Sequence, residues 1–313
     1  MNSPHATAYT KAQGQTHPYE VIDQFKNALR QAGVDAPSDL LADGQLHRCD
    51  AIDRRGKHDA CYLLFLDGVA AGGFQNWRDG QGWQDWRADI GRTLTTAEQV
   101  TQREIIQVAH QQREADDKQR KTEARERASL LLAKADQCID HLYLTRKGVA
   151  PHGIKQAGDR LVIPMRDVYG LLHSLQFIDR QGSKRFLTGG RKRGCFHLIG
   201  NLDLAGVMLI AEGYATGATL HEVTGYPVAV SFDAGNLKPV AQALRAKYPD
   251  LKIVICADDD YLTAGNPGIT CANEAAQAVG GVVAVPRFGS NRPDHATDFN
   301  DLHQLRRNQG ASC

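Results

Sequence analysis

The chain has 313 residues, a formal net charge of +1, 23% charged residues and 42% hydrophobic residues. These values are typical of a globular protein long enough for two domains with real cores, and they exclude a uniformly basic protein. Any contact with a nucleic acid would therefore need a local basic patch. No apolar run approaches the roughly 18 residues of a membrane span, so we expect no membrane association.

The first third of the sequence predicts a small α+β domain over residues 17–95. Apolar residues recur at helical spacing over 19–33, and residues 61–66 are typical of a strand that leads into a hairpin turn. Residues 1–16 are polar and lack the apolar core of a signal peptide, so we expect a disordered tail and a cytoplasmic location. The seven cysteines form no CxxC pair, which fits thiols in a reducing compartment.

The middle of the chain changes character twice. Residues 96–140 are rich in Gln, Arg, Glu, Lys and Ala, which predicts a long charged helix that acts as a solvated connector. Its basic residues could also contact a nucleic-acid backbone. Residues 141–204 predict a strand-rich subdomain, with its clearest strands over 160–165 and 171–178.

Residues 205–305 alternate predicted strands with predicted helices, a pattern that favours a parallel sheet with helices on both faces. The predicted fold class is therefore α+β N-terminal parts joined by a long helix to an α/β domain with a parallel sheet.

Two apolar runs in this last region end in carboxylates. Val207–Ala211 is followed by Glu212, and Lys252–Ala257 is followed by Asp258, Asp259 and Asp260. The carboxyl ends of parallel strands are where ligands gather in such sheets, and an all-oxygen site there favours Mg²⁺ or Mn²⁺ over zinc. Three adjacent carboxylates repel one another unless a cation neutralises them. The sequence therefore predicts a metal site, with a surface Glu and an acidic helix cap as the alternatives.

Two further groups of charged residues are candidates for the same site. Asp301, in the stretch 298–301, is either an additional metal ligand or part of the N-terminal cap of a short last helix. Upstream, a basic segment interleaved with glycines is suited to phosphate groups of a template or nucleotide, and its alternative is a solvated loop. Its cations are Lys184, Arg185, Arg191, Lys192 and Arg193.

Residues 207–302 resemble a Toprim domain, the fold shared by bacterial primases, type IA and type II topoisomerases and some nucleases. The family pattern is a Glu after the first strand and an Asp-x-Asp after a later one, matched here by Glu212 and by Asp258 with Asp260. The string 211–217 resembles the version found in DnaG-type and plasmid or phage primases, and 161–186 is similar to the segment just before Toprim in DnaG-type primases. Residues 17–95 are similar to the N-terminal part of conjugative-plasmid primases of the TraC type.

The resemblance implies a DNA primase that makes short RNA primers on single-stranded DNA. Glu212, Asp258 and Asp260 would be catalytic residues that hold one or two Mg²⁺ or Mn²⁺ ions, with Asp301 as a further ligand. Arg166 and Asp167 would lie near the same cleft, and the basic segment would bind nucleotide or template phosphates. The implied partners are single-stranded DNA, nucleoside triphosphates and a replicative helicase or conjugation proteins, in plasmid or mobile-element replication.

One departure from DnaG-type primases concerns the N-terminal zinc ribbon, which has no counterpart among the cysteines. The nearest residues, His47, Cys49, His58 and Cys61, fit no zinc spacing, so we expect no zinc. Template recognition would then fall to residues 45–90, where Trp77 and Trp83 are candidates for stacking on unpaired bases. Core packing is the alternative for at least two of its three tryptophans.

Three other functions share some of these features. A Toprim nuclease would use the same acids to activate water, but such nucleases commonly carry an ATPase domain, and no Walker A motif occurs in this sequence. A topoisomerase would need a cleavage tyrosine on a large separate domain. A non-catalytic DNA-binding replication accessory would not need the intact acidic set.

Overall fold

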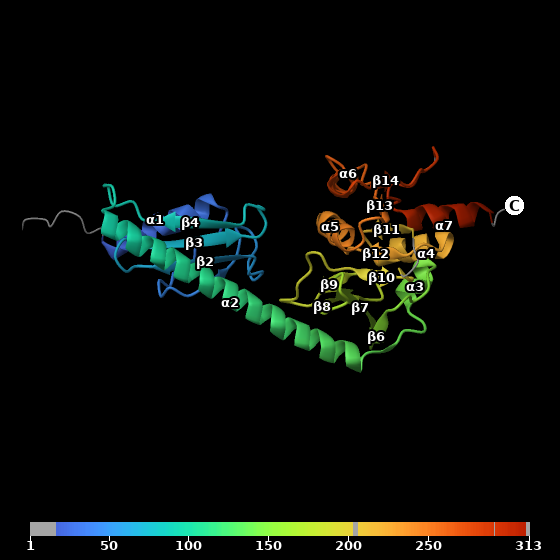
Figure 1. Cartoon of the computed structure of the whole chain (residues 1–313), viewed down its shortest axis with the longest axis horizontal. Coiled ribbons are helices and arrows are strands. Elements are labelled where there is room, and N and C mark those ends of the chain that lie inside the picture. Colours follow the sequence, from blue (N-terminus) through green and yellow to red (C-terminus); the bar gives the residue numbers. More distant parts are fainter. Residues whose placement is uncertain (1–16, 203–205, 291, 311–313) are drawn as a thin grey trace, which may run out of the picture. The chain divides into compact units, whose positions relative to one another are not determined.

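The computed structural model describes residues 17–202, 206–290 and 292–310 (Figure 1). It consists of two compact units that divide after Lys118, within the long helix α2 (Thr96–Lys134). The expected tail over residues 1–16 lies outside the described residues. No helix within the described ranges is both long and apolar enough to cross a membrane.

Unit 1 is an antiparallel sheet with a helix on one face, and the first half of α2 contacts the sheet through Arg113 over the ring of Trp83 and His110 beside Asp85. Its strands are β1 (His47–Cys49), β2 (Ala60–Phe65), β3 (Ala71–Asn76) and β4 (Trp83–Arg87), hydrogen-bonded in sequence order. Helix α1 (Pro18–Gln31) buries Phe25 and Leu29 against Tyr62, Leu64 and Phe74 of the sheet. This is the amphipathic helix that the sequence predicts, and its three buried residues recur at intervals of four.

Unit 2 begins with a second antiparallel sheet. Its strands, in spatial order, are β5 (Asp136–Gln137), β6 (Lys155–Ala157), β7 (Arg160–Arg166), β8 (Leu172–Ile178) and β9 (Lys184–Phe186). The last turns of α2 bury Ala128 against Val162 and Leu175 of this sheet. The predicted long helix ends at Lys134, six residues before the predicted boundary at 140. The ammonium group of Lys155 binds the carbonyls of Leu132 and Ala135 at 3.0 Å and so satisfies two groups of that helix end.

The third sheet is mostly parallel and follows the order β10 (His197–Ile199), β12 (Val228–Val230), β11 (Val207–Ala211), β13 (Lys252–Cys256), β14 (Val282–Ala284). Only β10, among these strands, runs antiparallel to its neighbour. Helix α4 (Tyr214–Thr224) covers one face together with the start of α7 (Phe299–Gly310). Helices α5 (Leu237–Lys247) and α6 (Pro267–Val279) cover the other face. The predicted fold class is confirmed.

A single apolar cluster joins the two sheets of unit 2. It contains Leu161, Ile163 and Met165 of β7, Leu209 of β11 and Ala218 of α4, all of them buried. Because both faces of β11 and β13 are covered, these strands are apolar along almost their whole length, as buried parallel strands are. The strand order places β12 and β13 on opposite sides of β11, and this reversal point is where open α/β sheets bind ligands.

Candidate active site

The strand ends bring Glu212 and Asp258 to the same edge of the parallel sheet. Strands β11 and β13 are paired in register up to Ala211 and Cys256. The segments that follow them, which carry Glu212 and Asp258, therefore leave the sheet side by side. Gly213 then begins helix α4 as its N-cap. A β-carbon on Gly213 would lie 3.5 Å from the Nζ atom of Lys184, an ordinary contact distance, so this cation lies directly beside the strand end.

A cavity of about 280 Å³ lies against these strand ends. Its acidic lining is Glu212, Asp258 and Asp298, and its basic lining includes Lys184 of β9 together with Arg146 and Lys147 of α3 (Leu142–Lys147). The remaining lining residues are Tyr143, Gln181, Gly182, Gly213, Ala215 and Thr216. The cavity is therefore bounded by three carboxylates and by three cations from a different sheet and helix.

The two strand-end acids hold their protons more tightly than exposed carboxyls do. The pKa of Glu212 is raised to about 7, and that of Asp258 to about 8. Burial is the main cause for both, the charges of Asp260 and Asp298 add to it, and the ammonium group of Lys184 opposes it. In addition, Asp258 Oδ1 is buried and has no hydrogen-bond partner among the described residues. A buried carboxylate oxygen that has no hydrogen-bond donor and lies near other carboxylates would be stabilised by a bound cation.

Asp259, between the two acids of the Asp-x-Asp motif, has a full set of protein partners. Arg292 Nη1 lies 2.5 Å from Asp259 Oδ2, and Asn266 Nδ2 donates to Asp259 Oδ1 at 2.7 Å. The guanidinium of Arg292 also binds the backbone carbonyls of Asp259 and Ala296. It lies 3.7 Å and 4.3 Å from the ring centroids of Tyr261 and Phe288, respectively. This arrangement fixes the segment that carries Asp258 and Asp260.

Asp260 is held by hydrogen bonds to residues at the start of α6. Its Oδ2 accepts a hydrogen bond from Gly268 N at 3.2 Å, and its backbone N donates to Asn266 Oδ1 at 3.0 Å. A β-carbon at Gly268 would approach the carbonyl oxygen of Asp258 to 2.3 Å. Glycine is therefore required at 268 for helix α6 to pack this closely on the acidic segment.

Asp298 and Asp301 form a reciprocal cap at the start of α7. Asp298 Oδ1 accepts from Asp301 N at 2.9 Å, and Asp301 Oδ2 accepts from Thr297 N at 3.0 Å. The other oxygen of Asp301 binds Lys147 at 3.2 Å, so both of its oxygens have protein partners. Asp298 lines the cavity and accepts a hydrogen bond from Thr216 Oγ1 at 3.0 Å. The role of Asp301 as a metal ligand stays a prediction, and Asp298 is the acid of this loop that faces the site.

The basic segment divides between the cavity and its surroundings. Lys184 lines the cavity, whereas Lys192 forms an ion pair with Asp233 at 2.5 Å and lies 5.1 Å from the ring centroid of Phe186. Arg191 donates to the carbonyl of Arg193 at 3.0 Å, and Arg185 is exposed on β9 opposite Phe177.

Arg166 and Asp167 stabilise the turn between β7 and β8 and do not line the cavity. Asp167 Oδ1 accepts from Tyr169 N and Leu171 N at 2.9 and 3.0 Å, and its Oδ2 lies 2.8 Å from His173 Nε2. The guanidinium of Arg166 donates to the carbonyl of Gly170 at 2.9 Å.

Arg146 and Lys147 are cavity residues that the sequence reasoning missed. They occupy the last turn of α3, before the left-handed cap residue Gly148. Basic residues are common at helix C-termini because they offset the helix dipole, so this position carries no distinctive functional signal in the sequence. In unit 1, Trp77 is exposed, Trp83 is half-buried and Trp86 packs against Phe25.

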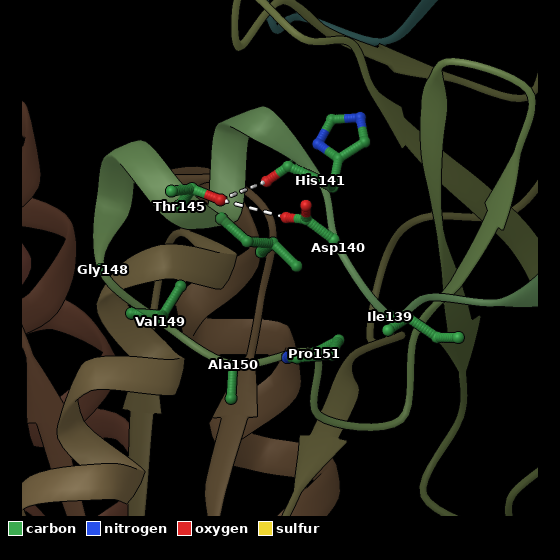
Figure 2. A pocket seen from close by; sticks show the side chains of 9 residues that line it. Ile139, Asp140, His141, Thr145, Gly148, Val149, Ala150 and Pro151 are labelled. Carbon is green, nitrogen blue, oxygen red and sulfur yellow. Dashed lines mark hydrogen bonds between the residues drawn. The ribbon is translucent and has the colours of Figure 1, made fainter.

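A second cavity of unit 2, of about 330 Å³, lies around the start of α3 (Figure 2). Thr145 Oγ1 is within hydrogen-bond distance of Asp140 Oδ1 and of the carbonyl of His141, at 3.2 and 3.3 Å. Ile139, Val149 and Pro151 contribute apolar lining. This cavity contains one acid, Asp140, and that acid is hydrogen-bonded to Thr145, so the strand-end cavity with its three acids is the candidate site.

No group of three or more His, Cys, Asp or Glu side chains in the described ranges already has the spacing of an assembled metal site. The donor chemistry nevertheless fits a hard divalent cation. The cavity acids supply carboxylate oxygens only, and one of these oxygens lacks any hydrogen-bond partner among the described residues.

Comparison with known proteins places the parallel-sheet region in a family. Residues 207–309 match the family described as the Toprim domain. Two curated relatives from Escherichia coli, both named DNA primase TraC, are 37% and 34% identical over 284 and 296 residues. The matches cover 85% and 88% of this chain but only 26% and 20% of the relatives, so the chain spans about a quarter of their length or less.

Two solved structures resemble parts of the chain. The primase fragment of the bacteriophage T7 primase-helicase protein shares 21% identity with a TM-score of 0.38, over 55% of this chain and 67% of its own. The DnaG primase catalytic domain bound to ssDNA shares 15% identity with a TM-score of 0.39, over 63% of this chain and 78% of its own. Residues 207–309 therefore match the Toprim domain, and the chain is similar over most of its length to two relatives named DNA primase TraC.

Proposed function

We propose that this chain is the catalytic part of a DNA primase, which synthesises short RNA primers on a single-stranded DNA template. The observation that carries the proposal is the strand-end cavity, where three carboxylates, one of them with an oxygen that lacks a hydrogen-bond partner among the described residues, face a set of cations. The similarity of the chain to the TraC primases supports the same reaction. Plasmid or mobile-element replication, with a helicase or conjugation proteins as partners, is the setting we propose from those relatives.

The acidic side of the cavity is suited to Mg²⁺ or Mn²⁺. Glu212 and Asp258 would provide the central ligands, with Asp260 and Asp298 beside them. When bound, such an ion lowers the pKa of a primer 3′-hydroxyl and neutralises the charge of the phosphates and of the departing pyrophosphate.

The basic side of the cavity is suited to a nucleoside triphosphate. Arg146 and Lys147 are held in place by hydrogen bonds to Gln181 O and to Asp301, so their charges are positioned before a ligand arrives. Charge-assisted contacts from these residues and Lys184 would hold the triphosphate. The 3′-oxygen would then form a bond to the α-phosphorus, the bond to pyrophosphate would break, and the hydroxyl proton would leave to solvent. We propose Arg166, Arg185 and the cations at 191–193 as contacts of the template outside the cavity.

A primer-synthesis assay tests this proposal. The chain is incubated with mixed-sequence single-stranded DNA, labelled ribonucleoside triphosphates and Mg²⁺ or Mn²⁺, beside an Asp258→Ala variant and an Asp250→Ala control at an exposed site. We expect short labelled oligomers from the wild type and the control only. Metal-dependent degradation of the template would instead identify a Toprim nuclease. No product of either kind, with either metal, would overturn primase activity for this chain.

A further inference from the structure

Unit 1 presents one exposed tryptophan at its surface. Trp77, directly after β3, is 42% exposed, and the guanidinium carbon of Arg48 lies 4.1 Å from its ring centroid. The other two tryptophans have structural roles. Trp86 packs against Phe25 at 4.8 Å between centroids, and the ring of Trp83 covers Gly73, where a β-carbon would come within 2.6 Å of it. Packing therefore accounts for Trp83 and Trp86 and leaves Trp77 unexplained.

A basic loop lies beside Trp77. The loop, residues 52–58, is exposed throughout and carries Arg54, Arg55 and Lys57. One acid, Asp53, lies within the loop, and Asp50 and Asp59 flank it. It connects β1 to β2, and the backbone N of Trp77 donates to the carbonyl of Asp59 at 3.1 Å, immediately after the loop. The loop cations and the exposed indole therefore belong to one surface.

The shape of this loop is fixed by carboxylates at both of its ends. Asp50 accepts from the backbone N of Gly56 and of His58 at 2.6 and 2.7 Å. Asp59 accepts from Ala51 N at 2.8 Å and lies 3.4 Å from Arg54 Nε. Within the loop, Asp53 and His58 have positive φ angles of 63° and 51°, a conformation that costs a non-glycine residue about 1 kcal/mol or more. A loop kept in a strained shape by dedicated hydrogen bonds displays its cations in one arrangement.

The chemistry of this surface matches single-stranded nucleic acid. An exposed indole stacks on unpaired bases of any sequence, and neighbouring lysines and arginines bind the backbone phosphates. A purely apolar partner would not account for the cations, and an acidic peptide would not need the exposed ring. In a duplex the bases are already stacked on one another and unavailable to the indole.

We propose that Trp77, Arg48 and the loop 52–58 form a binding site for single-stranded DNA, with a base stacked on Trp77 and phosphates on the loop cations. This site lies in a different unit from the strand-end acids. It binds DNA without requiring the nucleotidyl-transfer reaction proposed above.

Tryptophan fluorescence tests the proposal directly, because all three tryptophans of the sequence lie in unit 1. The full chain is titrated with an oligothymidylate of about 16 nucleotides, and its fluorescence is followed together with the anisotropy of a labelled oligonucleotide. We expect quenching in the wild type. Trp77→Ala should weaken binding roughly 5- to 100-fold, whereas Trp77→Phe, which keeps a stacking ring, should retain most of the affinity. Lys57→Gln should lower the salt dependence of binding by about one phosphate contact.

Two control variants make the result specific. Tyr19→Ala removes another exposed aromatic residue of unit 1, which is stacked on His17, and should leave the affinity unchanged. Asp258→Ala should also bind normally, so loss of primer synthesis with retained quenching would separate this site from the proposed reaction. Wild-type affinity in a folded Trp77→Ala variant would overturn the proposal, and so would equal affinity for duplex DNA.

Discussion

Asp258 and Asp259 are neighbours in the chain, yet their carboxylates have opposite surroundings. Asp259 is bound by Arg292 and Asn266, so its charge is neutralised within the protein. Asp258 lines a cavity beside Glu212 and Asp298, and its Oδ1 has no hydrogen-bond partner in the described part of the chain. Asp259 therefore stabilises the fold through its protein partners, whereas Asp258 has a carboxylate oxygen without such a partner in the described part of the chain.

The same contrast recurs across unit 2. Asp167 and Asp301 accept hydrogen bonds at both oxygens, from turn and helix-cap amides and from a His or Lys side chain. Glu212 and Asp258 instead have raised pKa values, mainly through burial. For these four acids, the partners of the carboxylate separate the structural acids from the candidate ligands. Asp298 is intermediate, because both of its oxygens accept hydrogen bonds and yet it lines the cavity. Substitutions of the two kinds of acid, or of their partners, should therefore have different effects on activity and on stability.

The largest effect is expected for catalysis. Asp258→Asn keeps the shape of the side chain but removes a ligand charge, and we expect primer synthesis to fall by about 10³-fold or more, because metal coordination contributes several kcal/mol to the transition state. Asp259→Asn should reduce the rate far less at a temperature where both variants are folded. Initial rates of labelled primer formation at saturating Mn²⁺ measure both. An equal loss of primer-synthesis rate in the two variants would show that the different surroundings of Asp258 and Asp259 do not matter for catalysis.

The second effect concerns folding. Arg292→Met removes the cation from Asp259 while its aliphatic side chain still fills the space between Tyr261 and Phe288, leaving a largely buried carboxylate without its charge partner. We expect a loss of about 3 kcal/mol in the free energy of unfolding, measured by urea denaturation. The double variant with Asp259→Asn should recover part of this loss because the unpaired charge is then gone. A double variant as unstable as the single one would contradict this assignment.

The third effect is a pH dependence of stability that arises from the candidate metal ligands Glu212 and Asp258. The folded chain holds protons on Glu212 and Asp258 up to pKa values of about 7 and 8, above those of the unfolded chain, whose ordinary values are near 4. Between pH 4 and 8 the metal-free folded state therefore binds more protons than the unfolded state, and stability is lost as the pH rises. Each unit of pKa difference between the two states corresponds to about 1.4 kcal/mol, so we expect the free energy of unfolding to fall by several kcal/mol over this range.

Thermal unfolding at several pH values checks this dependence. Asp258→Asn should flatten the curve, and excess Mg²⁺ should raise the wild-type melting temperature most at pH 8, where both acids are ionised. An unchanged slope in Asp258→Asn would locate the pH dependence elsewhere in the molecule.

The sequence predicted the parts of the site that depend on chain-local patterns. The apolar runs before Glu212 and Asp258 indicate buried strands, and buried parallel strands place their last residues at a common edge, so these two acids could be paired before the structure was known. The spacing of Asp298 and Asp301 also indicated a cap. It could not show which of the two carboxylates turns toward the cavity, because that depends on the packing of α7 against α4.

The remaining site residues come from distant segments, and no local pattern connects them. Arg146 is more than 60 residues from Glu212, and Arg292 is 33 residues from its partner Asp259. Helix α2 ends earlier than predicted, where residues 136–137 pair with β6 and Lys155 of that strand binds the carbonyls of Leu132 and Ala135. In each case the interaction joins residues that are distant in the sequence, and composition and periodicity do not predict such contacts.

The smallest effect tests whether Asp298 belongs with the candidate metal ligands. Thr216 and Thr219 are both buried on α4, and each forms a hydrogen bond to the α7 region, Thr216 to Asp298 and Thr219 to Asn300. Replacing either with Val, which has nearly the same shape, should cost about 1 kcal/mol in the free energy of unfolding. Only Thr216→Val should also weaken Mn²⁺ binding, by roughly fivefold, because only Thr216 orients a cavity carboxylate. Mn²⁺ titrations followed by electron paramagnetic resonance measure this difference. Equal Mn²⁺ affinity in the two variants would assign Asp298 to the helix cap alone and reduce the acidic side of the site to Glu212, Asp258 and Asp260.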